Sequence, residues 1–74
     1  MRFDYSILRG RIKDEYKTLG RFAEVLGISF STLSKLLNHK SHWTAELIMK
    51  SCQLLGIEVG QIGEYFFTLK YKKY

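Results

Sequence analysis

The chain has 74 residues, of which 46% are hydrophobic and 26% are charged, and its formal net charge is +5. This length fits one small globular domain and makes a large catalytic cleft between domains an unlikely design, so we expect no enzyme. A single cysteine excludes an internal disulfide, and the apolar runs are far shorter than a membrane span of about 20 residues. The N-terminus lacks an apolar signal region, which predicts a cytoplasmic protein without a membrane partner.

The first helix is predicted by apolar residues that recur every three or four positions: Tyr5, Leu8, Ile12, Tyr16 and Leu19. Asp4 precedes this pattern and is expected to cap the helix by accepting hydrogen bonds from its free backbone N–H groups. Gly10 lies in the middle of the helix, where glycine costs about 1 kcal/mol relative to alanine. We therefore expect a close backbone approach at Gly10.

A short second helix is predicted over residues 19–26, with Phe22, Ala23 and Leu26 buried. Gly27 can end it by taking a positive φ. Ile28 is expected to be buried in the turn, and Ser29 to cap a third helix over residues 30–37. The inward side chains of the third helix are then Leu33, Leu36 and Leu37.

A loop over residues 38–43 separates the third helix from a fourth. Thr44 is the expected N-cap of the fourth helix, and Gly56 its end. Its predicted apolar stripe consists of Ala45, Ile48, Met49, Cys52 and Leu55. A short fifth helix follows, marked by Ile57, Val59, Ile62 and Phe66.

The last residues change to a two-residue period, in which Phe67, Leu69 and Tyr71 alternate with polar side chains. This spacing is typical of a half-buried strand, which needs a partner edge. The strand could pair with a second copy and form a homodimer, lie across its own helices, or fray. We accordingly divide the chain into a helical domain over residues 1–67 and a basic C-terminal strand or tail over residues 68–74.

Residues 19–38 have the pattern of a helix-turn-helix. Ala23 is small where the two helices would cross, Gly27 permits the turn and Ile28 fills it. No acidic residue lies between Glu24 and Glu46, so the potential of this interval should be positive and attract a polyanion.

The same stretch resembles the Xre/Cro-type helix-turn-helix family in Phe22 to Ser29, Thr32 to Ser34, and Leu37-Asn38. The opening Phe3 to Ser6 and the later segments 54–57 and 64–67 resemble a subgroup of small phage lysogeny-switch proteins. That subgroup includes Cro-like repressors and modulator-of-repression antirepressors. The resemblance implies an all-α, compact five-helix, lambda-repressor-like domain, encoded by a phage or prophage and acting in the bacterial host cytoplasm.

In a DNA-reading member, the second helix of the motif enters the major groove of double-stranded operator DNA. The positions that would read bases or flank them are Ser29, Phe30, Ser31, Ser34, Lys35 and Asn38, and the phosphate contacts would come from Arg21, Asn38, His39 and Lys40.

The alternative is an antirepressor that binds the DNA-binding domain of a cognate phage repressor. The predicted reading face has no arginine or glutamine, which make strong paired contacts to bases. Phe30 is an unusual base reader but a natural anchor for a protein partner. For either function we expect no cofactor, no metal site and no small-molecule substrate, because no catalytic or ligand constellation can be assembled.

Overall fold

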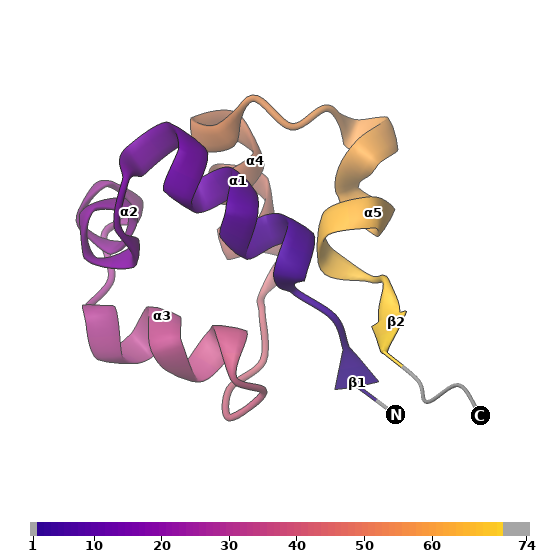
Figure 1. Ribbon diagram of the computed structural model, residues 1–74, viewed down its shortest axis with the longest axis horizontal. Helices are drawn as coiled ribbons and strands as arrows, with labels where there is room; N and C mark the ends of the chain where they lie inside the picture. Colours follow the sequence, from indigo (N-terminus) through magenta and orange to yellow (C-terminus); the bar gives the residue numbers. More distant parts are fainter. Residues whose placement is uncertain (1, 71–74) are drawn as a thin grey trace.

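The computed structural model describes residues 2–70, and Figure 1 shows them as a bundle of short helices. The α-helices in this part of the chain are α1 (Ser6–Tyr16), α2 (Leu19–Leu26), α3 (Phe30–Leu37), α4 (Ala45–Leu55) and α5 (Ile62–Phe66). A 3-10 turn, η1 (Val59–Gln61), precedes α5. Two short strands, β1 (Arg2–Phe3) and β2 (Leu69–Lys70), pair in antiparallel orientation. The predicted all-α class with five helices is confirmed.

The helices begin and end where local signals predict. Thr18, Ser29 and Thr44 each accept a hydrogen bond from a backbone N–H three positions later, at 3.0–3.1 Å. Gly27 and Gly56 end α2 and α4 with φ of 87° and 67°, a left-handed conformation that costs glycine little. The bounds of α2 and α3 therefore agree with the prediction.

Asp4 accepts a hydrogen bond at the start of α1 as predicted, although it lies one position before the N-cap. Its carboxylate accepts from the backbone N–H of Ser6, the first residue of α1, at 2.9 Å. The N-cap position itself is Tyr5, whose side chain makes no capping hydrogen bond. The close approach expected at Gly10 is wrong, because a Cβ built there meets no atom within 4 Å. Gly10 lies on the exposed side of α1, where no other element crosses.

The core lies between α1 and the other helices. Its largest fully buried side chains are Leu8, Ile12, Phe22, Leu26, Leu33, Leu36, Leu55 and Phe66. Ala45 and Met49 were predicted to lie on the apolar stripe of α4 and are exposed. The face of α4 that meets the core instead buries Ser51, which shows that α4 is rotated relative to the predicted stripe.

Side chains of α1 satisfy two backbone carbonyls at the end of α4. Arg11 donates from Nε and Nη2 to the carbonyl of Leu55 at 3.1 and 2.8 Å. Tyr16 donates to the neighbouring carbonyl of Leu54 at 2.9 Å. Because the last carbonyls of a helix have no partner within it, these bonds fix the C-terminus of α4 against α1.

The two ends of the described chain lie together at one side of the bundle (Figure 1). Arg2 pairs with Lys70 and Phe3 with Leu69. The Phe3 and Phe67 rings meet edge to face with centroids 5.4 Å apart. None of the three expected arrangements of the C-terminal strand included this pairing with the N-terminus of the same chain. The part of the predicted strand or tail at residues 71–74 lies outside the described residues.

Candidate interaction surface on helix α3

The turn between α2 and α3 fixes which side of α3 faces outward. The backbone N–H groups of Gly27 and Ile28 both donate to the carbonyl of Ala23, at 2.9 and 3.0 Å, and close the C-terminus of α2. Ala23 is buried and Ile28 packs against the core, as predicted. Since Leu33, Leu36 and Leu37 hold α3 by one side, its other side is left to solvent.

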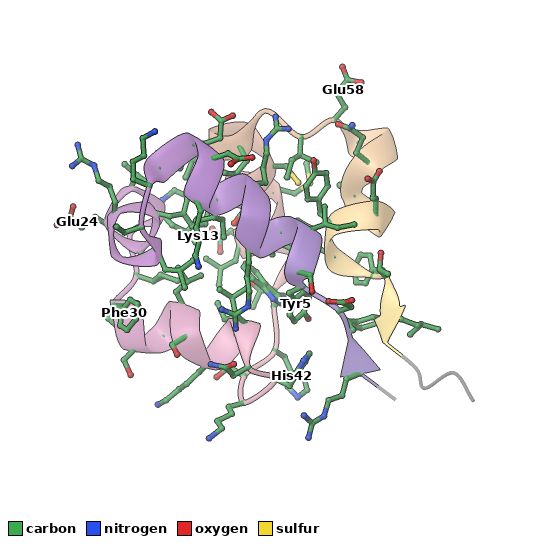
Figure 2. All side chains as sticks on the ribbon, viewed as in Figure 1. Tyr5, Lys13, Glu24, Phe30, His42 and Glu58 are labelled. Carbon is green, nitrogen blue, oxygen red and sulfur yellow. The ribbon has the colours of Figure 1, made fainter. Side chains whose placement is uncertain are left out.

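The outer side of α3 carries a shallow groove lined by Phe30, Ser31, Ser34, Lys35, Asn38 and Lys40. Phe30 is 57% exposed, at the end of α3 that meets α2 (Figure 2). No carboxylate lines this groove within the described chain. The groove thus combines an exposed aromatic ring with two lysines, and it brings together most of the residues predicted to contact a partner.

Two of the predicted contact residues already have partners inside the protein. Ser29 is occupied by its capping bond to Thr32. Asn38 accepts from Arg9 Nη2 at 3.1 Å through Oδ1 and donates to Ser34 Oγ at 3.2 Å through Nδ2. Both ends of the Asn38 amide are therefore engaged at the C-terminus of α3.

Arg21 and His39 lie away from the groove. Arg21 lines another hollow together with the acidic residues Glu15 and Glu24. The His39 ring stacks on Tyr5, with centroids 5.2 Å apart and an angle of 22° between the rings. His39 has a φ of 65°, which turns the chain out of α3 into the following loop.

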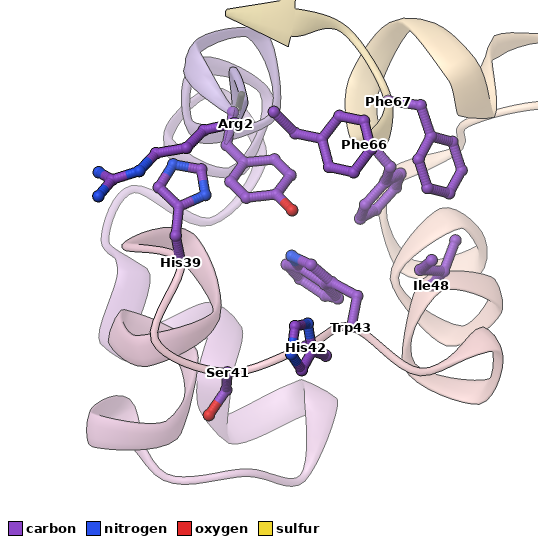
Figure 3. A pocket seen from close by; sticks show the side chains of 10 residues that line it. Arg2, His39, Ser41, His42, Trp43, Ile48, Phe66 and Phe67 are labelled. Carbon is purple, nitrogen blue, oxygen red and sulfur yellow. The ribbon is translucent and has the colours of Figure 1, made fainter.

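The structure also shows an aromatic cavity that we did not predict. It has a volume of about 350 Å³ and is lined mainly by rings, among them those of Phe3, Tyr5, Trp43, Phe66 and Phe67 (Figure 3). The Trp43 ring packs edge to face on Phe66, with centroids 5.0 Å apart. These rings come from residues 3–5 at the start of the chain, the loop before α4, and the end of α5. The sequence pattern also did not reveal the role of Arg9, whose side chain holds Asn38 at the C-terminus of α3.

Burial at this cavity raises the pKa of the Tyr5 hydroxyl above its ordinary value of 10.0, and the neighbouring Trp43 N–H offsets part of the rise. That contact lacks the geometry of a hydrogen bond, so the buried Trp43 Nε1 has no hydrogen-bond partner in the described chain. Burial likewise raises the pKa of the Cys52 thiol.

The described part of the chain, residues 2–70, also bears on metal binding and membrane insertion. These residues contain no group of three or more His, Cys, Asp or Glu that could hold a metal ion. No helix among them is long and apolar enough to cross a membrane.

Comparison with known proteins adds a family and a structural relative. A family model described as a protein of unknown function (DUF739) matches residues 1–69. The fold is similar to the solution structure of the modulator of repression (MOR) of the temperate bacteriophage TP901-1 from Lactococcus lactis, with a TM-score of 0.80. The two sequences are 37% identical, and the match covers 90% of each chain. No curated protein matches the chain.

Proposed function

This chain belongs to the DUF739 family, and we propose that it is an antirepressor that binds the DNA-binding domain of a cognate phage repressor. The observation that carries the proposal is its 37% identity, over 90% of both chains, to a modulator of phage repression.

The chemistry of the α3 groove supports a protein partner. Arginine, glutamine and asparagine make the strongest paired contacts to bases, and the groove holds only Asn38 of these types. Its amide is already bonded to Arg9 and Ser34. Phe30 is exposed at the other end of the groove, and aromatic side chains that become buried on association often dominate the binding energy.

The charge of the groove indicates which surface of the repressor fits it. Lys35 and Lys40 make the groove basic. A DNA-reading face is also basic because it must neutralise phosphates, so the two would repel each other. We therefore expect Phe30 to contact an apolar or acidic surface of the repressor domain.

The test is a calorimetric titration of the purified chain with the DNA-binding domain of its cognate repressor. We predict that Phe30→Ala weakens binding about tenfold or more, as expected of an anchor residue. Val59→Ala is the matched control, because Val59 is 75% exposed on η1, away from α3. Absence of binding by the unmodified chain would overturn the proposal, and equal affinities of the two variants would remove Phe30 from the interface.

Direct binding of operator DNA is a second candidate, favoured by the basic groove without carboxylates. Selection of bound duplexes from a random pool tests it. An enriched two-fold motif obtained with the isolated chain would support a self-sufficient regulator, whereas salt-sensitive background binding alone would contradict it.

A further inference from the structure

The aromatic cavity contains an unused hydrogen-bond donor. Trp43 Nε1 is buried and has no hydrogen-bond partner in the described chain. Figure 3 shows this nitrogen directed towards the space enclosed by the lining residues. A buried N–H without a partner is unfavourable because it has lost its hydrogen bonds to water, and a bound group that accepts a hydrogen bond would remove this cost.

The walls and the rim of the cavity differ in character. Phe66, Phe67 and Ile48 give it an apolar side, and its volume of about 350 Å³ is within the range of sites that enclose a ligand group. Arg2 and His39 lie at the other end (Figure 3), and His42 also lines the cavity. No carboxylate of the described residues lines it. A ligand with an apolar group next to an anionic group would match both the apolar side and the basic end of the cavity.

We propose that this cavity is a second docking site, which accepts a bulky apolar side chain of the repressor that is flanked by a carboxylate. The apolar side chain would pack between the aromatic walls, and an oxygen of the same segment would accept from Trp43 Nε1. The carboxylate would lie at the Arg2 end. This inference rests on the proposed function for the identity of the partner, but the chemistry of the site can be tested without the partner.

The first experiment uses the full chain and three small probes of one shape: phenylacetate, phenylacetamide and 2-phenylethylammonium. Trp43 is the single tryptophan of the chain, so its indole N–H gives one NMR signal that reports on the cavity. We expect saturable shifts that are strongest for phenylacetate, weaker for phenylacetamide and absent for the ammonium probe. No saturable shift, or an equal response to all three probes, would overturn the inference.

Two charge variants locate the anion. Arg2→Gln should reduce the affinity for phenylacetate about threefold and leave that for phenylacetamide unchanged, as expected for a solvent-exposed ion pair. Arg21→Gln is the matched control, because Arg21 lines a different hollow. The same loss in both variants would show that only net charge matters, and would contradict the assigned site.

The final experiment connects the cavity to the repressor. Replacing the Trp43 indole by a benzothiophene retains its shape and removes the N–H. Because this donor has no partner in the free chain, the replacement should retain or raise the stability of the free chain and weaken the repressor complex about fivefold. A complex of unchanged affinity would overturn the second docking site while the antirepressor function stands. Binding of phenylacetate without any binding of the repressor would instead overturn the proposed function.

Discussion

Lys17 shows how one residue can be held in a conformation that its side chain disfavours. It ends α1 with a φ of 73° and a ψ of −46°, while its N–H donates to the carbonyl of Lys13 at 2.9 Å. A residue with a Cβ pays roughly 1–3 kcal/mol for such a sparsely populated conformation with positive φ, which glycine adopts more readily. Gly27 and Gly56 serve the same purpose after α2 and α4.

We predict that Lys17→Gly raises the free energy of unfolding by about 1 kcal/mol, because it relieves this strain and retains the N–H bond. Urea denaturation followed by circular dichroism measures the change. Gly27→Ala, the reverse change at a φ of 87°, should lower the free energy of unfolding. A less stable Lys17→Gly variant would show that the Lys17 side chain contributes a contact that outweighs the strain.

Between elements, Arg11 joins α1 to the end of α4. Arg11 reaches the carbonyl of Leu55 with two nitrogens, and its Nε lies 3.8 Å from the Glu15 carboxylate on the same helix. The Arg11 side chain remains 34% exposed, so solvent screens the ion pair and the carbonyl bonds contribute more.

Arg11→Met should lower the free energy of unfolding by about 1 kcal/mol, because the carbonyl of Leu55 loses its charged donors while the apolar stem is retained. Lys13→Met serves as the control, since Lys13 is exposed on the same helix. Urea denaturation of both variants gives the comparison. Equal losses would mean that Arg11 acts through helix propensity or net charge and not through the end of α4.

The sequence predicts the α2–turn–α3 segment well because its signals are local. The caps Thr44 and Ser29 and the turn residue Gly27 act within a few positions of the chain, and the buried leucines of α3 follow a helical period. The predicted apolar stripe of α4 was wrong at Ala45 and Met49, because periodicity gives an average direction and not the packing of a rotated helix.

The sequence predicted only those parts of the candidate site that depend on residues close together in the chain. Phe30 and Lys35 follow from their positions on α3. The bond from Arg9 to Asn38 joins residues 29 positions apart, and the pairing of Phe3 with Leu69 joins the two ends of the chain. Such contacts form only once the bundle is packed, so two-residue strands and a cavity between distant rings leave no periodic signal.

The folded domain contains a buried phenol and a buried thiol, and from them we predict a loss of stability at high pH. The pKa of the Tyr5 hydroxyl is raised above 10.0 and that of the Cys52 thiol above 9.0, in both cases mainly by burial. Each group binds its proton more tightly in the folded chain than in the unfolded chain. Their stabilising contribution is therefore complete below about pH 9 and is lost as the pH rises through their folded-state pKa values.

We expect the free energy of unfolding, measured in urea under reducing conditions, to fall between pH 7 and about pH 10.5. Tyr5→Phe should reduce this fall because it removes one of the two titrating groups and retains the ring. A free energy of unfolding that is constant over this range would show that both groups ionise as readily in the folded chain as in the unfolded one.

The central claim, that this domain controls a phage repressor by binding it, is tested most directly on the repressor–operator complex. The measurement is the fluorescence anisotropy of labelled operator DNA, preloaded with the cognate repressor and titrated with this chain. We predict a saturable change in anisotropy that depends on the repressor, is much weaker with Phe30→Ala, and is absent when the DNA carries no repressor. An unchanged signal with repressor present, together with a saturable response on the operator alone, would contradict the antirepressor function and establish direct DNA binding.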